Sequence, residues 1–403
     1  MCSQLTAEQN DCIRIIAENE NISNYELEVN TGSVKGDGYL GIISTINLIS
    51  ERKNLNMILK MAETNEELRN KIVIRKAYLR EIYAYNRIFS EFENFQRKRN
   101  MQNGFSAFAK IYGSCEEDCK EFLILENLKE AGYKLWNRKE PMNAEHVALV
   151  FSEYGKFHAV SLAMRDQDTK MFEELTKDLR SIFENAYSRE KYERGVKITL
   201  EKGFKAVKGD NDAIEAFRRF SDSLRTFLLK QFKSPDNIVF THGDCWCNNM
   251  MFKYEDNQNP HKPTKVCFLE WQLSKMGSPV LDLSYFFFVC SSKEMFYDYK
   301  SYLKIYYETL SENLRKLSCD PENIFPYMLL ERHWKTYAKF GLYMGLIVIT
   351  LMLSEVEEAP IVKDVVKNGE TIFDIFNYEG IHVNEFNKRI LNIVTFMAEH
   401  ELI

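Results

Sequence analysis

Three polar residues, Asp244, Asn249 and Glu270, interrupt apolar segments of the chain and carry oxygen atoms suited to chemistry. Asp244 and Asn249 lie in the stretch HGDCWCNN, between two short apolar runs. Glu270 follows in the stretch FLEWQ, after a proline-containing turn. Phosphoryl transfer requires a group that orients a hydroxyl and oxygen ligands for magnesium. The residue types and their placement on two neighbouring loops therefore indicate a phosphotransferase site.

The segments around these loops predict a hairpin within a helical region. Met250–Tyr254 and Lys265–Trp271 have the composition of two strands that pair with each other. From Asn143 onward the apolar residues follow helical spacing, and residues 170–232 predict two or three amphipathic helices. The apolar run Phe340–Leu353 is shorter than the roughly 20 residues that cross a bilayer. It predicts a buried helix.

The first third of the chain predicts mainly strands. Residues 27–50 alternate around a glycine-rich turn that contains Gly36 and Gly38. Such a turn either covers phosphates as a flap or joins an ordinary hairpin. Phe105–Tyr112 and Glu121–Leu125 predict two further strands around an acidic turn.

A lysine and a glutamate in this region are candidates for a buried ion pair. Lys60 ends a short strand pattern, Leu55–Lys60, and Glu81 lies within the apolar stripe of a helix pattern. A carboxylate in that place either points to solvent from the edge of the stripe or pairs with a buried cation. Lys60 is the candidate partner, although each residue taken singly is more typical of a solvated charge.

Length and composition restrict the class of protein. The chain has 403 residues, 45% hydrophobic and 28% charged, which predicts a globular protein with two lobes. A composition shift after Glu126 places the predicted boundary between residues 1–126 and 127–403. The net charge of −6 argues against nucleic acid or an anionic membrane as the main partner.

The cysteine pattern and the N-terminus favour a cytoplasmic protein. Nine cysteines occur without the spacing of a disulfide scaffold, and the first residues lack the pattern of a secretory signal. Cys115 and Cys119 are therefore expected as free thiols. His242, Cys245 and Cys247 match no standard zinc spacing. His158, on an apolar helix face, is more typical of a core histidine than of a catalytic one.

Several motifs together resemble the ecdysteroid kinase-like family, within the choline-kinase and aminoglycoside-phosphotransferase group of protein-kinase-like folds. They are, in chain order, KGDGYLG, MILK, LREIYAY, FLILENLKEAGYKL, YGKFHAVSLAMR, HGDCWCNNMMF and FLEWQLSKMGSPVLDLSYFF. The resemblance covers most of residues 30–290. It implies an α+β bilobal fold, with a small antiparallel β N-lobe and a larger, mainly helical C-lobe.

The resemblance also implies a role for each matching residue. Asp244 would accept or orient the proton of a substrate hydroxyl, and Asn249 and Glu270 would bind magnesium. Lys60, paired with Glu81, would contact the phosphates of ATP under a flap that contains Gly36 and Gly38. The remaining implied roles are backbone contacts to adenine from Glu126, Asn127 and Leu128, and support of the catalytic loop by His242 and Asp282.

One departure from the family pattern bears on activity. The family usually has Asp-Phe-Gln where this chain has Glu270-Trp271-Gln272, and the extra methylene moves the carboxylate by about 1.5 Å on an unchanged backbone. The expected function is an ATP- and magnesium-dependent kinase for a hydroxyl of a small molecule, an ecdysteroid or another lipophilic alcohol. The alternative is a weak or inactive kinase-like binder of small molecules or nucleotides. A protein kinase ranks third, because no separate activation segment follows Glu270.

Overall fold

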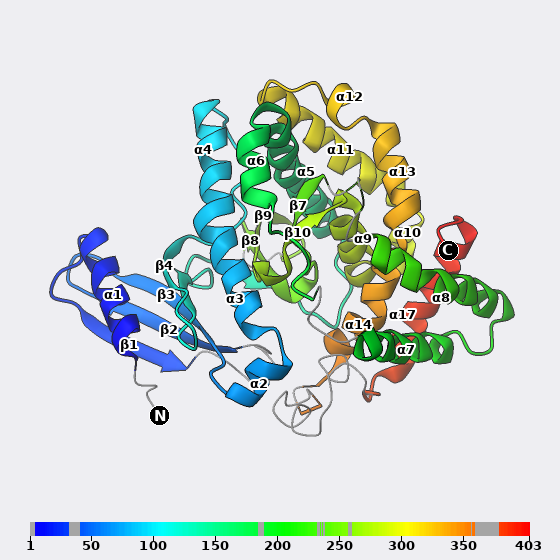
Figure 1. The fold of residues 1–403 in the computed structure, drawn as a ribbon, viewed down its shortest axis with the longest axis horizontal. Helices are drawn as coiled ribbons and strands as arrows, with labels where there is room; N and C mark the ends of the chain where they lie inside the picture. Colours follow the sequence, from blue (N-terminus) through cyan, green and yellow to red (C-terminus); the bar gives the residue numbers. More distant parts are fainter. Residues whose placement is uncertain are drawn as a thin grey trace.

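The computed structural model describes residues 5–31, 41–183, 189–231, 234, 236, 238–256, 260–355, 357–358 and 379–403. An antiparallel sheet forms the N-terminal part, and helices dominate the remainder (Figure 1). This arrangement confirms the predicted fold class. Gly36 and Gly38, the predicted flap glycines, lie outside the described residues.

Five strands of the N-terminal part form one antiparallel sheet in the order β1-β2-β3-β5-β4. Their bounds are β1 Glu26–Thr31, β2 Gly41–Ile49, β3 Leu55–Ala62, β4 Ile111–Cys115 and β5 Phe122–Glu126. Met57 and Leu59 of β3 are fully buried against helix α1 (Ala7–Asn19). Because side chains alternate along a strand, Ile58 and Lys60 project from the opposite face, where they line a cleft.

The segment after β3 is helical, as its apolar spacing predicts. It consists of α2 (Glu66–Lys71), α3 (Ile74–Tyr83), the π-helical turn η1 (Ala84–Phe89) and α4 (Ser90–Lys98). Helix α3 contacts both β3 and the 3-10 turn η3 (Trp271–Leu273) that follows Glu270. Its buried face is formed by residues at helical spacing, Ile74, Ala77, Tyr78, Glu81 and Ile82.

The predicted strand over Phe105–Tyr112 is wrong, since β4 spans Ile111–Cys115. The Gln96 side chain binds both backbone groups of Phe105, accepting from its N–H at 2.7 Å and donating to its C=O at 3.0 Å. The Phe105 ring packs against Phe157 of the helical part, with ring centroids 4.7 Å apart. This apolar segment is thus buried between elements and not in the sheet.

Helices of the second part pack around α5 (Ala144–Gln167), which α11 (Tyr299–Lys316) follows along its length. Asn143 caps α5 by accepting the backbone N–H of His146 at 3.0 Å. Residues 170–232 form three helices in their described part, in agreement with the expectation of two or three. The bounds of the other helices are α6 Thr169–Thr176, α7 Arg189–Ala206, α8 Asn211–Gln231, α9 Pro279–Cys290, α10 Lys293–Phe296, α12 Pro321–Ile324, α13 Tyr327–Tyr337, α14 Lys339–Leu353 and α17 Val383–Glu399.

Two small sheets carry the loops that contain Asp244 and Glu270. Strand β7 (Val239–Thr241) pairs with β10 (Lys275–Gly277), and β8 (Met250–Tyr254) pairs with β9 (Pro263–Phe268) and β6 (Lys134–Leu135). The predicted hairpin is therefore present. Its second strand ends at Phe268, three residues earlier than predicted, because Trp271 begins η3.

Helix α14 is buried along most of its length, which confirms the prediction for residues 340–353. It packs closely on α9, since a Cβ at Gly341 would lie 2.3 Å from the carbonyl oxygen of Ser284. Among the described helices, none alone is long and apolar enough to cross a membrane. The bent pair of Pro321–Tyr337 and Lys339–Leu353, which meet at 50°, meets that criterion jointly by length and composition.

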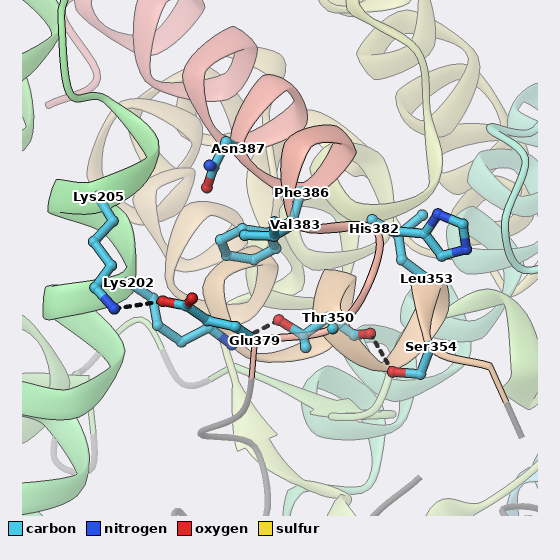
Figure 2. Close-up of a pocket in the computed structure, with 11 residues that line it drawn as sticks. Lys202, Lys205, Thr350, Leu353, Ser354, Glu379, His382, Val383, Phe386 and Asn387 are labelled. Atoms are coloured by element: carbon cyan, nitrogen blue, oxygen red, sulfur yellow. Dashed lines mark hydrogen bonds and ion pairs between the residues drawn. The ribbon is translucent and has the colours of Figure 1, made fainter. Parts of the chain in front are cut away.

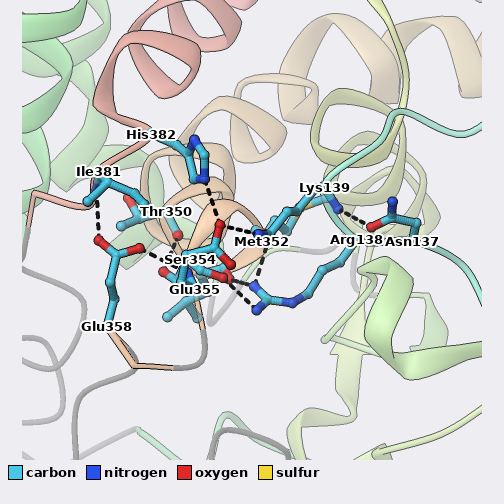
Figure 3. A network of polar contacts seen from close by, with 11 residues as sticks. Asn137, Arg138, Lys139, Thr350, Met352, Ser354, Glu355, Glu358, Ile381 and His382 are labelled. Atoms are coloured by element: carbon cyan, nitrogen blue, oxygen red, sulfur yellow. Dashed lines mark hydrogen bonds and ion pairs between the residues drawn. The ribbon is translucent and has the colours of Figure 1, made fainter.

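A polar network fixes the C-terminal end of α14 (Figure 3). Arg138 donates hydrogen bonds to the carbonyl oxygens of Met352 at 2.9 Å and Ser354 at 2.6 Å. Lys139 forms a 2.5 Å ion pair with Glu355, which also bonds His382 at 2.9 Å. Because the last carbonyls of a helix lack intrahelical partners, a cation in this place stabilises α14.

Aromatic packing joins the two parts of the chain. Trp271 is fully buried, with its ring 4.6 Å from that of Phe89 and 5.3 Å from that of Phe157. The sheet itself ends at Glu126, and the next strand, β6, pairs with β8 in the helical part. The division into residues 1–126 and 127–403 stays a prediction.

The edge of the sheet next to α2 and α3 contains a buried carboxylate. Glu121 has a fully buried side chain, and its Oε1 lies 2.7 Å from Arg69 and 2.5 Å from Arg75. Burial alone would raise the pKa of this carboxyl group, but hydrogen bonds from the two guanidinium groups hold its pKa below the ordinary value. The carboxylate is therefore ionised and fully paired.

Glu121→Gln should lower the free energy of unfolding by about 3 kcal/mol, because it removes the buried carboxylate that pairs with Arg69 and leaves this mostly buried guanidinium only the exposed Asp118. Denaturant-induced unfolding measures this change. Glu117→Gln is the matched control, since Glu117 is exposed in the same turn. Equal effects of the two substitutions would contradict the assignment.

Candidate active site

A cleft of about 300 Å³ lies between the N-terminal sheet and the loops of the helical part. Residues from β2, β3, α3 and the end of β5 form one wall, and the two polar loops form the other. Eight of the predicted site residues line this one cleft: Lys60, Glu81, Glu126, Asn127, Leu128, Asp244, Asn249 and Glu270.

Lys60 bridges two carboxylates at the inner end of the cleft. Its Nζ lies 2.5 Å from Glu81 Oε2 and 2.8 Å from Glu270 Oε2. Burial alone would lower the pKa of Lys60, but the two carboxylates raise it well above the ordinary value, so the amine stays charged. Of the two alternatives for Glu81, a solvated carboxylate or a pair with a buried cation, the structure shows the pair.

Glu81 reaches this position because it shares the buried face of α3 with Tyr78 and Ile82. Burial raises the pKa of its carboxyl group to about 7, although Lys60 lowers it. Arg80, the preceding residue, donates hydrogen bonds to the carbonyl oxygens of Ser274 and, at 2.9 Å, Arg180. These bonds hold α3 against the segment that follows Glu270.

The loop that carries Asp244 is held by Asp282 of α9. The Asp282 carboxylate accepts the backbone N–H of His242 at 2.7 Å and that of Gly243 at 3.0 Å, and the Cys245 thiol at 3.2 Å. Burial would raise the pKa of Asp282, but bonds from His158 and from the His242 backbone hold its pKa below the ordinary value. The loop therefore rests on an ionised side chain.

His242 and Gly243 fix the path of the chain into Asp244. Burial lowers the pKa of His242 to about 4, so the ring is neutral. Its Nδ1 accepts the backbone N–H of Asp244 at 3.1 Å, and its Nε2 therefore donates to Leu269 O at 2.8 Å. Gly243 has φ +84°, and a Cβ there would lie 2.4 Å from Leu273 O, which excludes other residues.

Both oxygens of the Asp244 carboxylate accept hydrogen bonds. Asn249 Nδ2 donates to Oδ2 at 2.7 Å, and the Tyr285 hydroxyl donates to Oδ1 at 2.9 Å. Burial raises the pKa of Asp244 to about 6, against the lowering effect of these two bonds. Such a carboxylate is ionised at neutral pH and basic enough to accept a proton.

Asn249 and Glu270 offer hard oxygen ligands on the same wall. The Nδ2 group of Asn249 donates to the Asp244 carbonyl oxygen at 3.0 Å as well as to its carboxylate, so the Asn249 Oδ1 is the free end of this amide. Glu270 has the left-handed backbone angle φ 63°. Magnesium takes few protein oxygens and completes its shell with water and phosphates. The residues present therefore fit magnesium bound with a nucleotide.

Backbone hydrogen bonds at the end of β5 reduce the number of N–H groups that are available for the predicted contacts to adenine. The N–H of Glu126 donates to Lys110 O at 2.8 Å, and that of Asn127 donates to Asn56 O at 3.2 Å. Within the described part of the chain, the N–H of Leu128 has no such acceptor. Of the three predicted residues, Leu128 is thus the one whose N–H can bind a ligand.

The other sequence expectations have clear outcomes. His158 is a core histidine, bonded to Tyr306 at 3.1 Å and to Asp282 at 3.4 Å. Cys115 and Cys119 are free thiols. Among the described residues no cluster of three or more acidic, histidine or cysteine side chains is placed to hold a metal ion.

Two residues of the site were missed from sequence. They are Tyr285, which bonds the Asp244 carboxylate, and Arg80, which bonds the segment after Glu270. Tyr285 lies three positions after Asp282 on a helix, which places both on one face, so this spacing was a usable signal. The sequence carries no comparable signal for Arg80.

A second cavity of about 230 Å³ lies between α7, α14 and α17 (Figure 2). Lys202 donates to the Thr350 hydroxyl at 2.6 Å, and Lys205 forms an ion pair with Glu379. No predicted site residue lines this cavity.

Residues 35–319 match the family model described as ecdysteroid kinase-like. No curated protein matches the chain significantly.

Similar solved structures include the GDP complex of a mutant aminoglycoside 2'-phosphotransferase-IIIa, at 9% identity and TM-score 0.41, with 94% of this chain and 97% of that chain covered. A spectinomycin phosphotransferase in complex with ADP and spectinomycin has 9% identity and TM-score 0.39, with 94% and 98% covered. The GDP complex of the wild-type 2'-phosphotransferase-IIIa has 10% identity and TM-score 0.41, with 90% and 100% covered.

Asp282→Asn should lower the free energy of unfolding by about 2–3 kcal/mol, because an amide can no longer accept from every donor around it. Thermal or denaturant unfolding measures the loss. Asp298→Asn, at an exposed position just before α11, is the control and should change stability by at most about 0.5 kcal/mol. A loss no larger than that of the control would show that Asp282 does not support the loop.

Proposed function

Because the chain belongs to the ecdysteroid kinase-like family, we propose that it transfers the γ-phosphoryl group of ATP to a hydroxyl of a small molecule, with magnesium. The observation that supports this most strongly is the meeting of the Asp244 carboxylate, the Lys60–Glu81 pair and two candidate magnesium ligands in one cleft. Phosphoryl transfer depends on positioning and charge neutralisation more than on covalent work by the protein.

Asp244 is the proposed catalytic base. The acceptor hydroxyl donates its proton to the Asp244 carboxylate while its oxygen bonds to the γ-phosphorus. The bond between that phosphorus and the bridging oxygen of ADP breaks, and ADP leaves with the electron pair. The elevated pKa of Asp244, to about 6, suits a group that receives a proton near neutral pH.

Nucleotide binding is assigned to the other wall of the cleft. Lys60 is the proposed contact to the α- and β-phosphates, and Glu81 keeps its amine in place at 2.5 Å. The N–H of Leu128 is the proposed donor to adenine. Asn249 and Glu270 are the proposed ligands of magnesium, which would neutralise phosphate charge and orient the leaving group.

The acceptor is proposed to be a lipophilic alcohol, with an ecdysteroid as the first candidate. Trp246 and Met251 line the cleft beside Asp244 and offer apolar surface. On the buried side, the Phe340 ring of α14 lies 6.3 Å from that of Tyr285, which bonds Asp244. Trp246 thus offers an aromatic surface in the cleft that contains Asp244, which supports a lipophilic acceptor.

A binder without efficient catalysis is the second candidate. It is favoured by one observation, the glutamate at position 270 where the family usually has aspartate. Magnesium demands nearly ideal octahedral geometry, and small misplacements of catalytic groups can reduce rates about a hundredfold. The 2.8 Å bond from Lys60 supports the kinase, because it places the Glu270 carboxylate inside the cleft.

Asp244→Asn should reduce phosphate transfer at least a hundredfold, because the amide cannot accept the proton. The assay incubates the protein with ATP, magnesium and a panel of steroids and small alcohols, and mass spectrometry detects phosphate addition. Stabilisation by ATP in a thermal-shift titration should remain. Asp212→Asn, on the exposed surface of α8, is the control. Wild-type turnover by Asp244→Asn would refute the assignment of the base.

Magnesium should increase the thermal shift that ATP produces in the wild-type protein, and Glu270→Gln should remove that increase. Glu270→Asp should retain the increase without a large gain in turnover, since the glutamate already reaches into the cleft. If magnesium has no effect on the wild-type protein and no phosphate is transferred, the binder is the better description. A large gain in turnover from Glu270→Asp would show that glutamate impairs the site.

A further inference from the structure

Helix α9 contacts the catalytic loop through two side chains that lie one turn apart. Asp282 accepts the backbone N–H groups of the loop, and Tyr285 donates its hydroxyl to Asp244 Oδ1 at 2.9 Å. Residues three apart on a helix lie on the same face. One rigid element thus holds both the backbone of the loop and its reactive carboxylate.

We propose that Tyr285 is a positioning residue that orients the Asp244 carboxylate for proton transfer, an inference that rests on the proposed phosphotransfer. Rotation of the Asp244 carboxylate would break the Tyr285 bond to Oδ1 and the Asn249 bond to Oδ2 together. Each oxygen of an ionised carboxylate has two lone pairs, so these two bonds leave acceptor sites on the carboxylate for the acceptor hydroxyl. The carboxylate is therefore fixed and still able to accept a proton.

Tyr285 acts as a donor and keeps its own proton. Its side chain is fully buried, and burial raises its pKa well above the ordinary value. The proton of this hydroxyl therefore stays available for the bond to Asp244 Oδ1 at 2.9 Å.

The other groups that act on Asp244 are few and defined. Glu270, from the loop after β9, raises the pKa of Asp244, and Lys60 neutralises that carboxylate. On the same loop, the Asn249 side-chain bond and a bond from Trp246 lower the pKa. From α9, Asp282 lies close to the same loop but is itself paired with His158 and backbone donors. Among the described residues outside 244–246, two side chains form hydrogen bonds to the Asp244 carboxylate. They are Asn249 and Tyr285.

Packing around Tyr285 leaves its ring little freedom. The Phe340 ring meets it edge to face, with centroids 6.3 Å apart. Close approach of α14 at Gly341, where a Cβ would lie 2.3 Å from Ser284 O, fixes the adjacent turn of α9. The hydroxyl is therefore pre-placed for Asp244, and its bond does not require reorganisation when substrates bind.

Tyr285→Phe removes the hydroxyl and keeps the ring. We expect kcat for phosphate transfer to fall about tenfold in Tyr285→Phe, because the Asp244 carboxylate loses one of its two orienting hydrogen bonds. Tyr306→Phe is the matched control, because it removes an equally buried hydroxyl whose bond goes to His158 at 3.1 Å. It should leave kcat unchanged.

The comparison of kcat with KM gives the second measurement. The KM for ATP and the thermal shift that ATP produces should be unchanged in Tyr285→Phe, because Tyr285 does not line the cleft. A purely structural tyrosine would lower the melting temperature and leave kcat unchanged at temperatures well below it, which would overturn the proposal. Absence of phosphate transfer in the wild-type protein would refute the proposed function, whereas an active wild-type protein with an equally active Tyr285→Phe variant would refute the positioning role alone.

Discussion

A single buried cation, Lys60 of β3, joins three of the elements that line the cleft. Its amine contacts Glu81 on α3 at 2.5 Å and Glu270 on the loop after β9 at 2.8 Å. Removing a lysine from water costs several kcal/mol unless its charge is compensated. The strand, the helix and the loop must therefore meet within hydrogen-bonding distance, and the fold around them is arranged to achieve this. Arg80 and the buried Trp271 secure the same helix and loop from the side away from the amine.

The second requirement is that the Asp244 carboxylate on the opposite wall is held in place. Helix α9 contributes to this through Asp282 and Tyr285. Asp282 holds the backbone before Asp244, while Tyr285 and Asn249 hold the carboxylate itself. In the proposed reaction Asp244 accepts a proton, and this role requires a defined orientation and a pKa near the working pH. Burial supplies the basicity, and the two donors limit it.

Sequence patterns were sufficient where local rules determine the structure. The alternation along β3 places Lys60 on the cleft face, and the helical stripe of α3 places Glu81 beside it. Prediction failed where apolar residues are buried by distant elements, as at Phe105, whose ring packs on Phe157 and whose backbone is bound by Gln96. Arg80 could not be recognised either, because its acceptors are backbone carbonyl groups, which carry no signature in the sequence.

The Glu270 carboxylate pairs with Lys60 in the cleft and is also a proposed ligand of magnesium. This carboxylate already has a cation at 2.8 Å, so in the proposed reaction Lys60 and magnesium draw on the same oxygens. A carboxylate has about four lone-pair sites, so it can accept from Lys60 at Oε2 and still offer sites to a second cation. The longer side chain of glutamate has one more rotatable bond than aspartate, which permits the carboxylate to adjust without movement of the left-handed backbone at φ 63°. The extra methylene thus adds reach and freedom together, and the rigidity of the Lys60–Glu81 pair limits how far the carboxylate can move.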